Sequence, residues 1–321
     1  MKKRIICLAL AALMVLSAFT LAGCGEKKAN DKYVVGICQL VQHAALDAAT
    51  QGFMDALNEA LPGKVEFQNK NASGEANNCA TIVNGFVSDK VDLIMANATP
   101  ALTAAVSATK DIPVLGTSIT AYGVALDIAD FSGTVGGNVS GTSDLADLSA
   151  QAAMITEWFP DTKTVGLLFC SAEPNSRYQI EEVAKYLADK GIESKEFAFT
   201  DTNDVTAVTQ AAADYADVVY IPTDNTAASN TEAIANVLVP AKVPAICGEE
   251  GICAGCGVAT LSISYYDLGV TTGKMAAKIL TGETDISKMP IEYTGATKKY
   301  NASMCDALGI KPLDGYTAIG E

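Results

Sequence analysis

Short apolar runs alternate with amphipathic stretches from about residue 33 to the end of the chain. The run Tyr33–Cys38 has the continuous apolar character of a buried parallel strand, and Ala45–Ala60 carries its apolar residues on one side. The same pattern predicts strands at Val65–Gln68, Val91–Ala96 and Ile112–Gly116, and helices at Glu75–Ser88 and Pro100–Thr109. Alternation of this kind predicts a parallel sheet with helices on both faces.

The pattern restarts in the second half of the chain. Thr164–Cys170 matches the first strand, Asp217–Pro222 matches the third and Val243–Ile246 matches the fourth. We therefore predict an α/β fold with two similar, doubly wound parallel-sheet lobes. The rest supplies strands at Val258–Ile263 and Ile291–Thr294 and helices near Asp267–Leu280 and Ala302–Leu308. Too short for a third domain, it is expected to return to one lobe and then to the other.

The first residues are similar to a bacterial lipoprotein leader. A positive segment at residues 2–4 precedes an apolar segment, Ile5–Thr20, which is shorter than the roughly 20 residues of a membrane-spanning helix. Small residues stand directly before Cys24, as in the lipobox, whose cysteine is acylated. We predict a signal peptide at 1–23, a lipidated tether at 24–32 and an extracytoplasmic protein anchored to the bacterial cell membrane. An ordinary cleaved signal with an incidental cysteine is the alternative.

The chain is strongly acidic. Its formal net charge is −15 at pH 7, and losing the three positive residues of the leader would make it −18. Such a charge argues against nucleic acid as a partner and disfavours long-range attraction of anions. Any anionic group of a ligand is therefore expected to be held by local dipoles.

Seven cysteines remain beyond the leader and Cys24. Their one cluster in the sequence is Cys247-x5-Cys253-x2-Cys256, and Cys-x-x-Cys occurs in metal sites, redox sites and disulfides. A zinc site usually has a second ligand pair, and the single histidine, His43, is far away in the sequence. Free thiols are the favoured interpretation, with a disulfide or a metal as alternatives, and no metal or cofactor site is predicted.

Polar residues follow the predicted strands at the ends where ligands bind in open parallel sheets. The first lobe has Gln39, His43, Asn97, Thr99, Thr117 and Ser118 there; the second has Ser171, Glu173, Asn175, Ser176, Thr223, Asp224, Asn225, Glu249 and Glu250. Arg177 is the one cation near such an end. Hydroxyls and helix N-terminal amides suit a single carboxylate, and Asp224 or Glu173 suits an ammonium group. The ligand predicted from these residues is a zwitterionic amino acid.

Several of these residues also have a purely structural interpretation. Thr99, Ser176 and Thr226 stand where helix caps are expected. A sugar is less favoured as the ligand because sugar pockets usually contain aromatic side chains, and the sole tryptophan, Trp158, is expected at a helix end. Gly136-Gly137 and Gly141 lack the context of a dinucleotide site and are expected in turns. The sequence contains no catalytic constellation, so we predict a binding protein and not an enzyme.

Many short stretches match one known family in order. They are Val35–Gln39, His43–Asp47, Gly52-Phe53, Phe67–Asn69, Ala98–Pro100, Gly141–Asp144, Asn175-Ser176, Pro222–Thr226, Tyr266–Gly269 and Gly273–Met275. Through them the whole mature chain resembles the ABC-transporter substrate-binding lipoproteins of the tryptophan/tyrosine type. The resemblance implies a type I periplasmic-binding-protein fold with three crossings between lobes, assigned here as 33–143 plus 265–292 and 144–264 plus 293–321.

The resemblance also implies a mechanism and a pocket. The lobes would close on an aromatic or apolar L-amino acid, and the protein, expected as a monomer, would pass it to a membrane permease driven by an ATPase. The implied pocket residues are Gln39, His43, Thr99, Ser118, Asp144, Asn175, Ser176, Asp224 and Asn225. The cysteine-rich stretch Cys247–Cys256 departs from the pattern and leaves the ligand open. A sugar- or nucleoside-binding receptor, or a sensor of the same fold, is the alternative.

Overall fold

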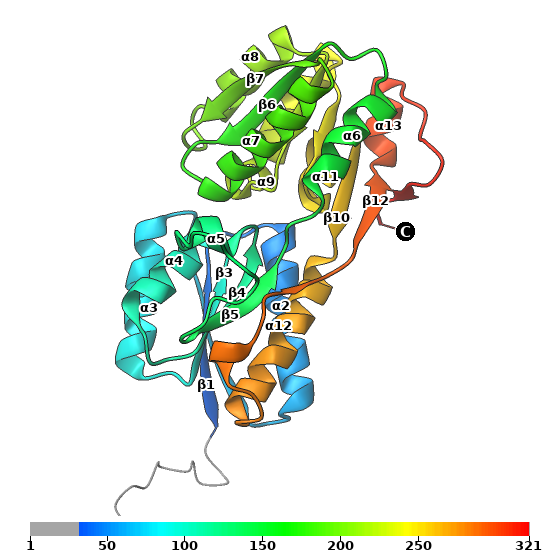
Figure 1. Cartoon of the computed structure of the whole chain (residues 1–321). Helices are drawn as coiled ribbons and strands as arrows, with labels where there is room; N and C mark the ends of the chain where they lie inside the picture. Colours follow the sequence, from blue (N-terminus) through cyan, green and yellow to red (C-terminus); the bar gives the residue numbers. More distant parts are fainter. Residues whose placement is uncertain (1–31, 321) are drawn as a thin grey trace, which may run out of the picture. The chain divides into compact units, whose positions relative to one another are not determined.

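The computed structural model describes residues 32–320, and most of its helices and strands are labelled in Figure 1. The predicted signal peptide, Cys24 and the tether as far as residue 31 lie outside the described residues. Within the described part, no helix is long and apolar enough to cross a membrane. The strands form two sheets, one of six strands and one of seven.

The first sheet has the strand order β11-β5-β4-β3-β1-β2. Its strands are β1 (Tyr33–Gln39), β2 (Val65–Asn71), β3 (Leu93–Asn97), β4 (Val114–Ile119), β5 (Val139–Ser143) and β11 (Glu292–Tyr293). Every neighbouring pair is parallel. The central strands β3 and β4 are buried along their whole length, as expected for a sheet covered on both faces.

Helices cover both faces of the first sheet. The helices α2 (Ala44–Ala60) and α12 (Tyr265–Leu280) pack on one face, and α3 (Ala76–Asp89) and α4 (Thr99–Ala108) pack on the other. The short helix α5 (Tyr122–Ala125) follows β4. The helices α2 and α12 lie side by side although they are far apart in sequence (Figure 1). Their backbones can touch because Gly52 and Gly269 have no side chain at the contact. A Cβ at Gly269 would collide with the Ala49 carbonyl, and one at Gly52 would collide with the Tyr266 carbonyl.

The second sheet has the order β13-β12-β10-β9-β8-β6-β7. Its strands are β6 (Thr164–Cys170), β7 (Glu193–Phe199), β8 (Val218–Ile221), β9 (Ala245–Cys247), β10 (Ala259–Ile263), β12 (Ala296–Tyr300) and β13 (Thr317–Ala318). The order β7-β6-β8-β9-β10 repeats β2-β1-β3-β4-β5, and β12 is antiparallel to β10. The predicted α/β architecture with two mainly parallel sheets is therefore confirmed.

Six helices and a one-turn helix accompany the second sheet. One face carries α6 (Leu148–Trp158), α7 (Pro174–Asp189) and α13 (Ala302–Leu308), and the other carries α8 (Val205–Tyr215), α10 (Thr231–Ala241) and α11 (Glu250–Cys256). The short helix α9 (Asn225–Ala228) follows β8. The chain passes between the sheets three times: from β5 to α6, from β10 to α12, and from β11 to β12.

Some local predictions were wrong. The strand expected at Ile112–Gly116 runs on to Ile119 as β4, so Thr117 and Ser118 lie within a strand and not after it. Gly141, expected in a turn, lies inside β5 with φ 145°, and a Cβ there would collide with the Gly116 carbonyl. The sequence of β5 gave little signal because it contains one large apolar residue, Val139.

Candidate functional site

A cavity lies where the carboxyl ends of the strands of both sheets meet. It is lined by His43, Leu46, Ser118, Thr120 and Asp144 from the part of the chain around the first sheet, by Asn175, Thr223, Asp224, Asn225, Ala228 and Glu249 from the part around the second, and by Tyr265 at the start of α12. The volume of this cavity is about 10 Å³, which is room for about one water molecule. A hydrogen-bond contact across the cavity joins His43 Nε2 to Asn225 Oδ1 at 3.3 Å.

Three buried polar atoms in this cavity have no hydrogen-bond partner among the described residues: Ser118 Oγ, Asp144 Oδ1 and Asn175 Oδ1. Asn175 Nδ2 donates to the Thr223 carbonyl at 3.1 Å, which fixes the orientation of the amide and leaves its oxygen as a free acceptor. Buried polar atoms are nearly always paired, so a cluster of unpaired ones in one cavity indicates a place for a polar ligand. Two of the three atoms are acceptors only, and the hydroxyl can also donate.

The backbone on the Ser118 side of the cavity is unusual. Ser118 has φ 55°, in the left-handed region that non-glycine residues rarely occupy. The neighbouring strand end has Ala98 at φ 87° and ψ 157°, a conformation found almost only in glycine. Ala98 N donates to the Thr117 carbonyl at 3.1 Å, so the two strained positions are linked. Such strain is typical of functional sites.

The carboxylates on the side of the second sheet are already hydrogen-bonded. Glu173 Oε1 accepts from Thr226 N and Oγ1 at 2.9 and 2.8 Å, and Glu173 Oε2 accepts from Asn225 N and Nδ2 at 3.0 and 2.6 Å. Asp224 caps α9, because its Oδ1 accepts from Ala227 N at 2.8 Å while its Oδ2 accepts from Cys170 N at 2.7 Å. These two acids hold the loop after β8 in place.

Burial shifts the charges of the cavity. Burial raises the pKa of Asp144 to about 6 and that of Glu249 to about 7, and it raises the pKa of Asp224 to about 7 with the charge of Glu173 adding to the effect. Burial lowers the pKa of His43, so its imidazole is neutral at pH 7. No lysine or arginine is among the described residues that line the cavity. The site therefore favours a ligand that brings a positive group.

The residues predicted from the sequence separate into two groups. Eight of them line the cavity: His43, Ser118, Asp144, Asn175, Thr223, Asp224, Asn225 and Glu249. The others do not line it: Gln39, Asn97, Thr99, Thr117, Ser171, Glu173, Ser176 and Glu250. Gln39 is bonded to Asp47 and Thr50, and the hydroxyls of Ser171 and Ser176 donate to the carbonyls of Phe199 and Thr223. These side chains support the walls.

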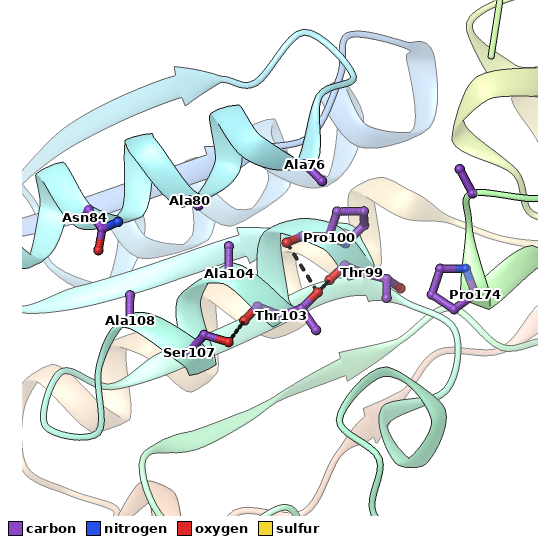
Figure 2. Close-up of a pocket in the computed structure, with 11 residues that line it drawn as sticks. Ala76, Ala80, Asn84, Thr99, Pro100, Thr103, Ala104, Ser107, Ala108 and Pro174 are labelled. Atoms are coloured by element: carbon purple, nitrogen blue, oxygen red, sulfur yellow. Dashed lines mark hydrogen bonds between the residues drawn. The ribbon is translucent and has the colours of Figure 1, made fainter. Parts of the chain in front are cut away.

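Thr99 lies in a separate groove between α3 and α4. Ala98 is the N-cap of α4, so Thr99 is the first helical residue and not the cap that its position before Pro100 predicted. Figure 2 shows Thr99 and Pro100 at one end of this groove, near Pro174, and the bond from Thr103 Oγ1 to the Thr99 carbonyl, 2.7 Å long. The groove is lined mainly by alanines and short polar side chains.

Sequence reasoning missed four lining residues: Leu46, Thr120, Ala228 and Tyr265. Tyr265 stands two residues after β10, at the carboxyl end of a parallel strand, so the rule that placed the other polar residues at strand ends also applies to it. Thr120 follows β4 directly and was hidden by the error in the end of that strand. Leu46 and Ala228 are apolar and carry no local signal of a site.

The cysteine cluster lies behind the cavity wall. Cys247, Cys253 and Cys256 are buried in the apolar core between the second sheet and its helices. All seven cysteines of the described residues are unpaired and buried. Residues 32–320 contain no group of three or more His, Cys, Asp or Glu side chains that could hold a metal ion. Glu249, two residues after Cys247, is the N-cap of α11 and brings this region to the cavity.

Comparison with known proteins identifies the family. The profile of the family described as ABC transporter substrate binding protein matches residues 34–311. The chain belongs to the ABC transporter substrate-binding proteins. Members of this family are solute-binding receptors and not enzymes, and they act outside the cytoplasm. The predictions of a binding protein and of an extracytoplasmic location are therefore confirmed.

Two relatives of this substrate-binding protein carry ligands in their names. The tyrosine-binding protein of Clostridioides difficile (strain R20291) is 32% identical over 313 residues, covering 92% of this chain and 89% of that protein. The ABC domain of Streptococcus pneumoniae in complex with L-Trp is 29% identical with a TM-score of 0.85, covering 90% of this chain and 100% of that one. The type I binding-protein fold is thereby confirmed.

A third relative differs in conformation. The ligand-free, open structure of a substrate-binding protein with adhesive properties from Clostridium difficile is 32% identical and covers 89% of this chain and 99% of its own, but its TM-score is 0.68. The substrate-binding protein described here is thus more similar in structure to the L-Trp complex although its identity to that protein is lower.

Proposed function

We propose that this substrate-binding protein takes up an aromatic or large apolar L-amino acid in the cavity between its two sheets and delivers it to an ABC permease and its ATPase. The observation that carries the proposal is the set of unpaired atoms Asp144 Oδ1, Asn175 Oδ1 and Ser118 Oγ in one acidic cavity. An ammonium group donates to the two acceptors, and a carboxylate accepts from the hydroxyl. The ligands in the names of two relatives support an aromatic side chain.

Asp144 is the carboxylate that receives the ammonium group in this proposal. The sequence favoured Asp224 or Glu173, but the oxygens of both accept hydrogen bonds from backbone or side-chain donors of the protein itself. Asp144 has one oxygen bonded to Tyr265 and the other unpaired. A hydrogen bond to a charged group contributes about 1.5–3 kcal/mol, so this oxygen is where ligand binding gains most.

Opening and closing of the lobes controls access. With room for about one water, the cavity cannot admit an amino acid without an opening motion. We assign the lobes as 33–143 plus 265–292 and 144–264 plus 293–321. The sheet membership of the strands supports this division except at its edges, where β11 (Glu292–Tyr293) crosses one boundary and Asp144, just past another, is bonded to Ile119 of the first sheet. A ligand that bridges them stabilises the closed state by its differential affinity. Lipidation at Cys24 would keep the protein close to its permease.

Calorimetry of the purified protein with L-tryptophan and two analogues tests this function. Indole-3-propionate lacks the ammonium group and tryptamine lacks the carboxylate. We expect micromolar or tighter binding of L-tryptophan or L-tyrosine, loss of at least about 100-fold for indole-3-propionate, and a smaller loss for tryptamine. Equal binding of indole-3-propionate, or saturable binding only of a neutral sugar or nucleoside, would overturn the proposal.

A further inference from the structure

The carboxyl group of Asp144 is bonded to the phenol of Tyr265 and lies beside the hydroxyl of Thr120. Tyr265 OH donates to Asp144 Oδ2 at 2.9 Å, while Asp144 Oδ1 remains unpaired in the cavity. Asp144 directly follows β5 and Tyr265 is the first residue of α12, which follows β10. The bond therefore joins two of the three places where the chain passes between the sheets.

Both partners are fixed to the first sheet. Asp144 N donates to the Ile119 carbonyl at 3.2 Å, and the residue before it, Ser143, donates through Oγ to the Thr120 carbonyl at 3.0 Å. Tyr265 begins a helix whose backbone touches α2 at Gly269. The phenol thus reaches Asp144 from a helix that packs on the first sheet, and it also lies beside Thr223 on the other side of the cavity and packs against Ile263 of β10.

We propose that Tyr265 is a positioning residue for ligand binding: its hydroxyl orients Asp144, aims the unpaired oxygen at the ligand's ammonium group and keeps the carboxylate ionised. This inference rests on the proposed function and extends it. Asp144 and Tyr265 stand at the points where two of the three segments between the sheets leave or reach the first sheet. Ligand binding at Asp144 therefore acts on these two segments, which couples binding to closure of the lobes.

The pair also predicts how binding depends on pH. The groups that face Asp144 are Tyr265 of α12, Tyr122 of α5 and Glu249 before α11, with Asp224 and His43 across the cavity. Burial raises the pKa of Asp144 to about 6, and the Tyr265 hydrogen bond opposes that rise. The ammonium group needs the ionised carboxylate, so affinity falls as pH falls through this pKa.

Lowering the pH changes folding stability through Asp144 in the opposite direction to ligand affinity. A carboxyl group with a raised pKa contributes stability that is fully present below its ordinary pKa and is lost as the pH rises through the raised value. For Asp144 this loss occurs as the pH rises through about 6. Acidification to pH 5 should therefore increase the contribution of Asp144 to the stability of the ligand-free protein, and the same acidification should weaken ligand binding.

The sequence offers a matched pair of variants. Tyr266, the next residue, donates its hydroxyl to Asp55 Oδ2 at 3.1 Å on the surface. Calorimetry with L-tryptophan is run from pH 5 to 8 on the wild type, Tyr265→Phe and Tyr266→Phe. We expect Tyr265→Phe to weaken binding about ten- to a hundredfold at pH 7 and to move the pH of half-maximal affinity upward by about one unit. Tyr266→Phe should match the wild type.

A ligand-free measurement separates this inference from the proposed function. The ¹³C shift of the Asp144 carboxyl carbon is followed by NMR against pH in the same three proteins. Tyr265→Phe should raise the titration midpoint of Asp144 by about one unit, and Tyr266→Phe should not move it. An unmoved midpoint, or a loss of affinity by one factor at every pH, would overturn the positioning role. A wild type that binds no amino acid would overturn the proposed function, and the NMR midpoint would still decide whether Tyr265 sets the ionisation of Asp144.

Discussion

The two walls of the cavity are both acidic, but they use their acids differently. On the side of the second sheet, Glu173 and Asp224 accept hydrogen bonds from the protein at both oxygens. On the side of the first sheet, Asp144 keeps one buried oxygen unpaired, and so does Ser118. A buried carboxylate whose oxygens already accept hydrogen bonds from the protein stabilises the fold. A buried carboxylate oxygen that is left unpaired can form a favourable hydrogen bond with a ligand.

The largest expected effect is on ligand affinity and comes from Asp144→Asn. The change removes the charge that faces the ammonium group but keeps the shape of the side chain. We expect the affinity for L-tryptophan, measured by calorimetry, to fall at least about 100-fold, or about 3 kcal/mol. The melting temperature of the ligand-free protein should not fall, because burial already disfavours the ionised form of Asp144. Nearly unchanged affinity would place the ammonium group elsewhere in the cavity.

The opposite wall should respond in its stability. Glu173→Gln places an amide NH₂ opposite the donors of Asn225 or Thr226, and the loop after β8 loses charge-assisted bonds. We expect the free energy of unfolding in urea to fall by about 2–3 kcal/mol, with less than about a tenfold loss of affinity. Glu182→Gln, which changes an exposed acid paired with Lys185, is the control and should leave the urea midpoint unchanged. If Glu173→Gln abolished binding without destabilising the fold, the contrast between the walls would be wrong.

A smaller effect is expected from the hydroxyl of Ser118. Ser118→Ala removes the one donor among the three unpaired atoms and leaves the fold's own hydrogen bonds in place. Affinity for L-tryptophan should fall about two- to tenfold, with little change for tryptamine, which has no carboxylate. Ser140→Ala is the control because the Ser140 hydroxyl is buried and bonds to the Met289 carbonyl away from the cavity. It should lower stability and leave affinity unchanged.

Much of the fold could be predicted because its signals are local. Buried parallel strands such as β6 are continuous apolar runs, and its predicted bounds, Thr164–Cys170, are those observed. The helix α13 was likewise predicted with its observed bounds, Ala302–Leu308. The strand β7, Glu193–Phe199, was not predicted because it lies at the edge of its sheet and exposes polar residues along much of its length.

The sequence by itself determined the two-lobed α/β architecture and the region of the site. Parallel strands bring their carboxyl ends to one edge, so polar residues after them must gather there. Only the tertiary structure decided which acid is free, because hydrogen-bond partners come from distant segments: Glu173 meets Asn225 across 52 positions, and Asp144 meets Tyr265 across 121. Local pattern places a carboxylate near a site, but long-range packing decides whether its oxygens are already used.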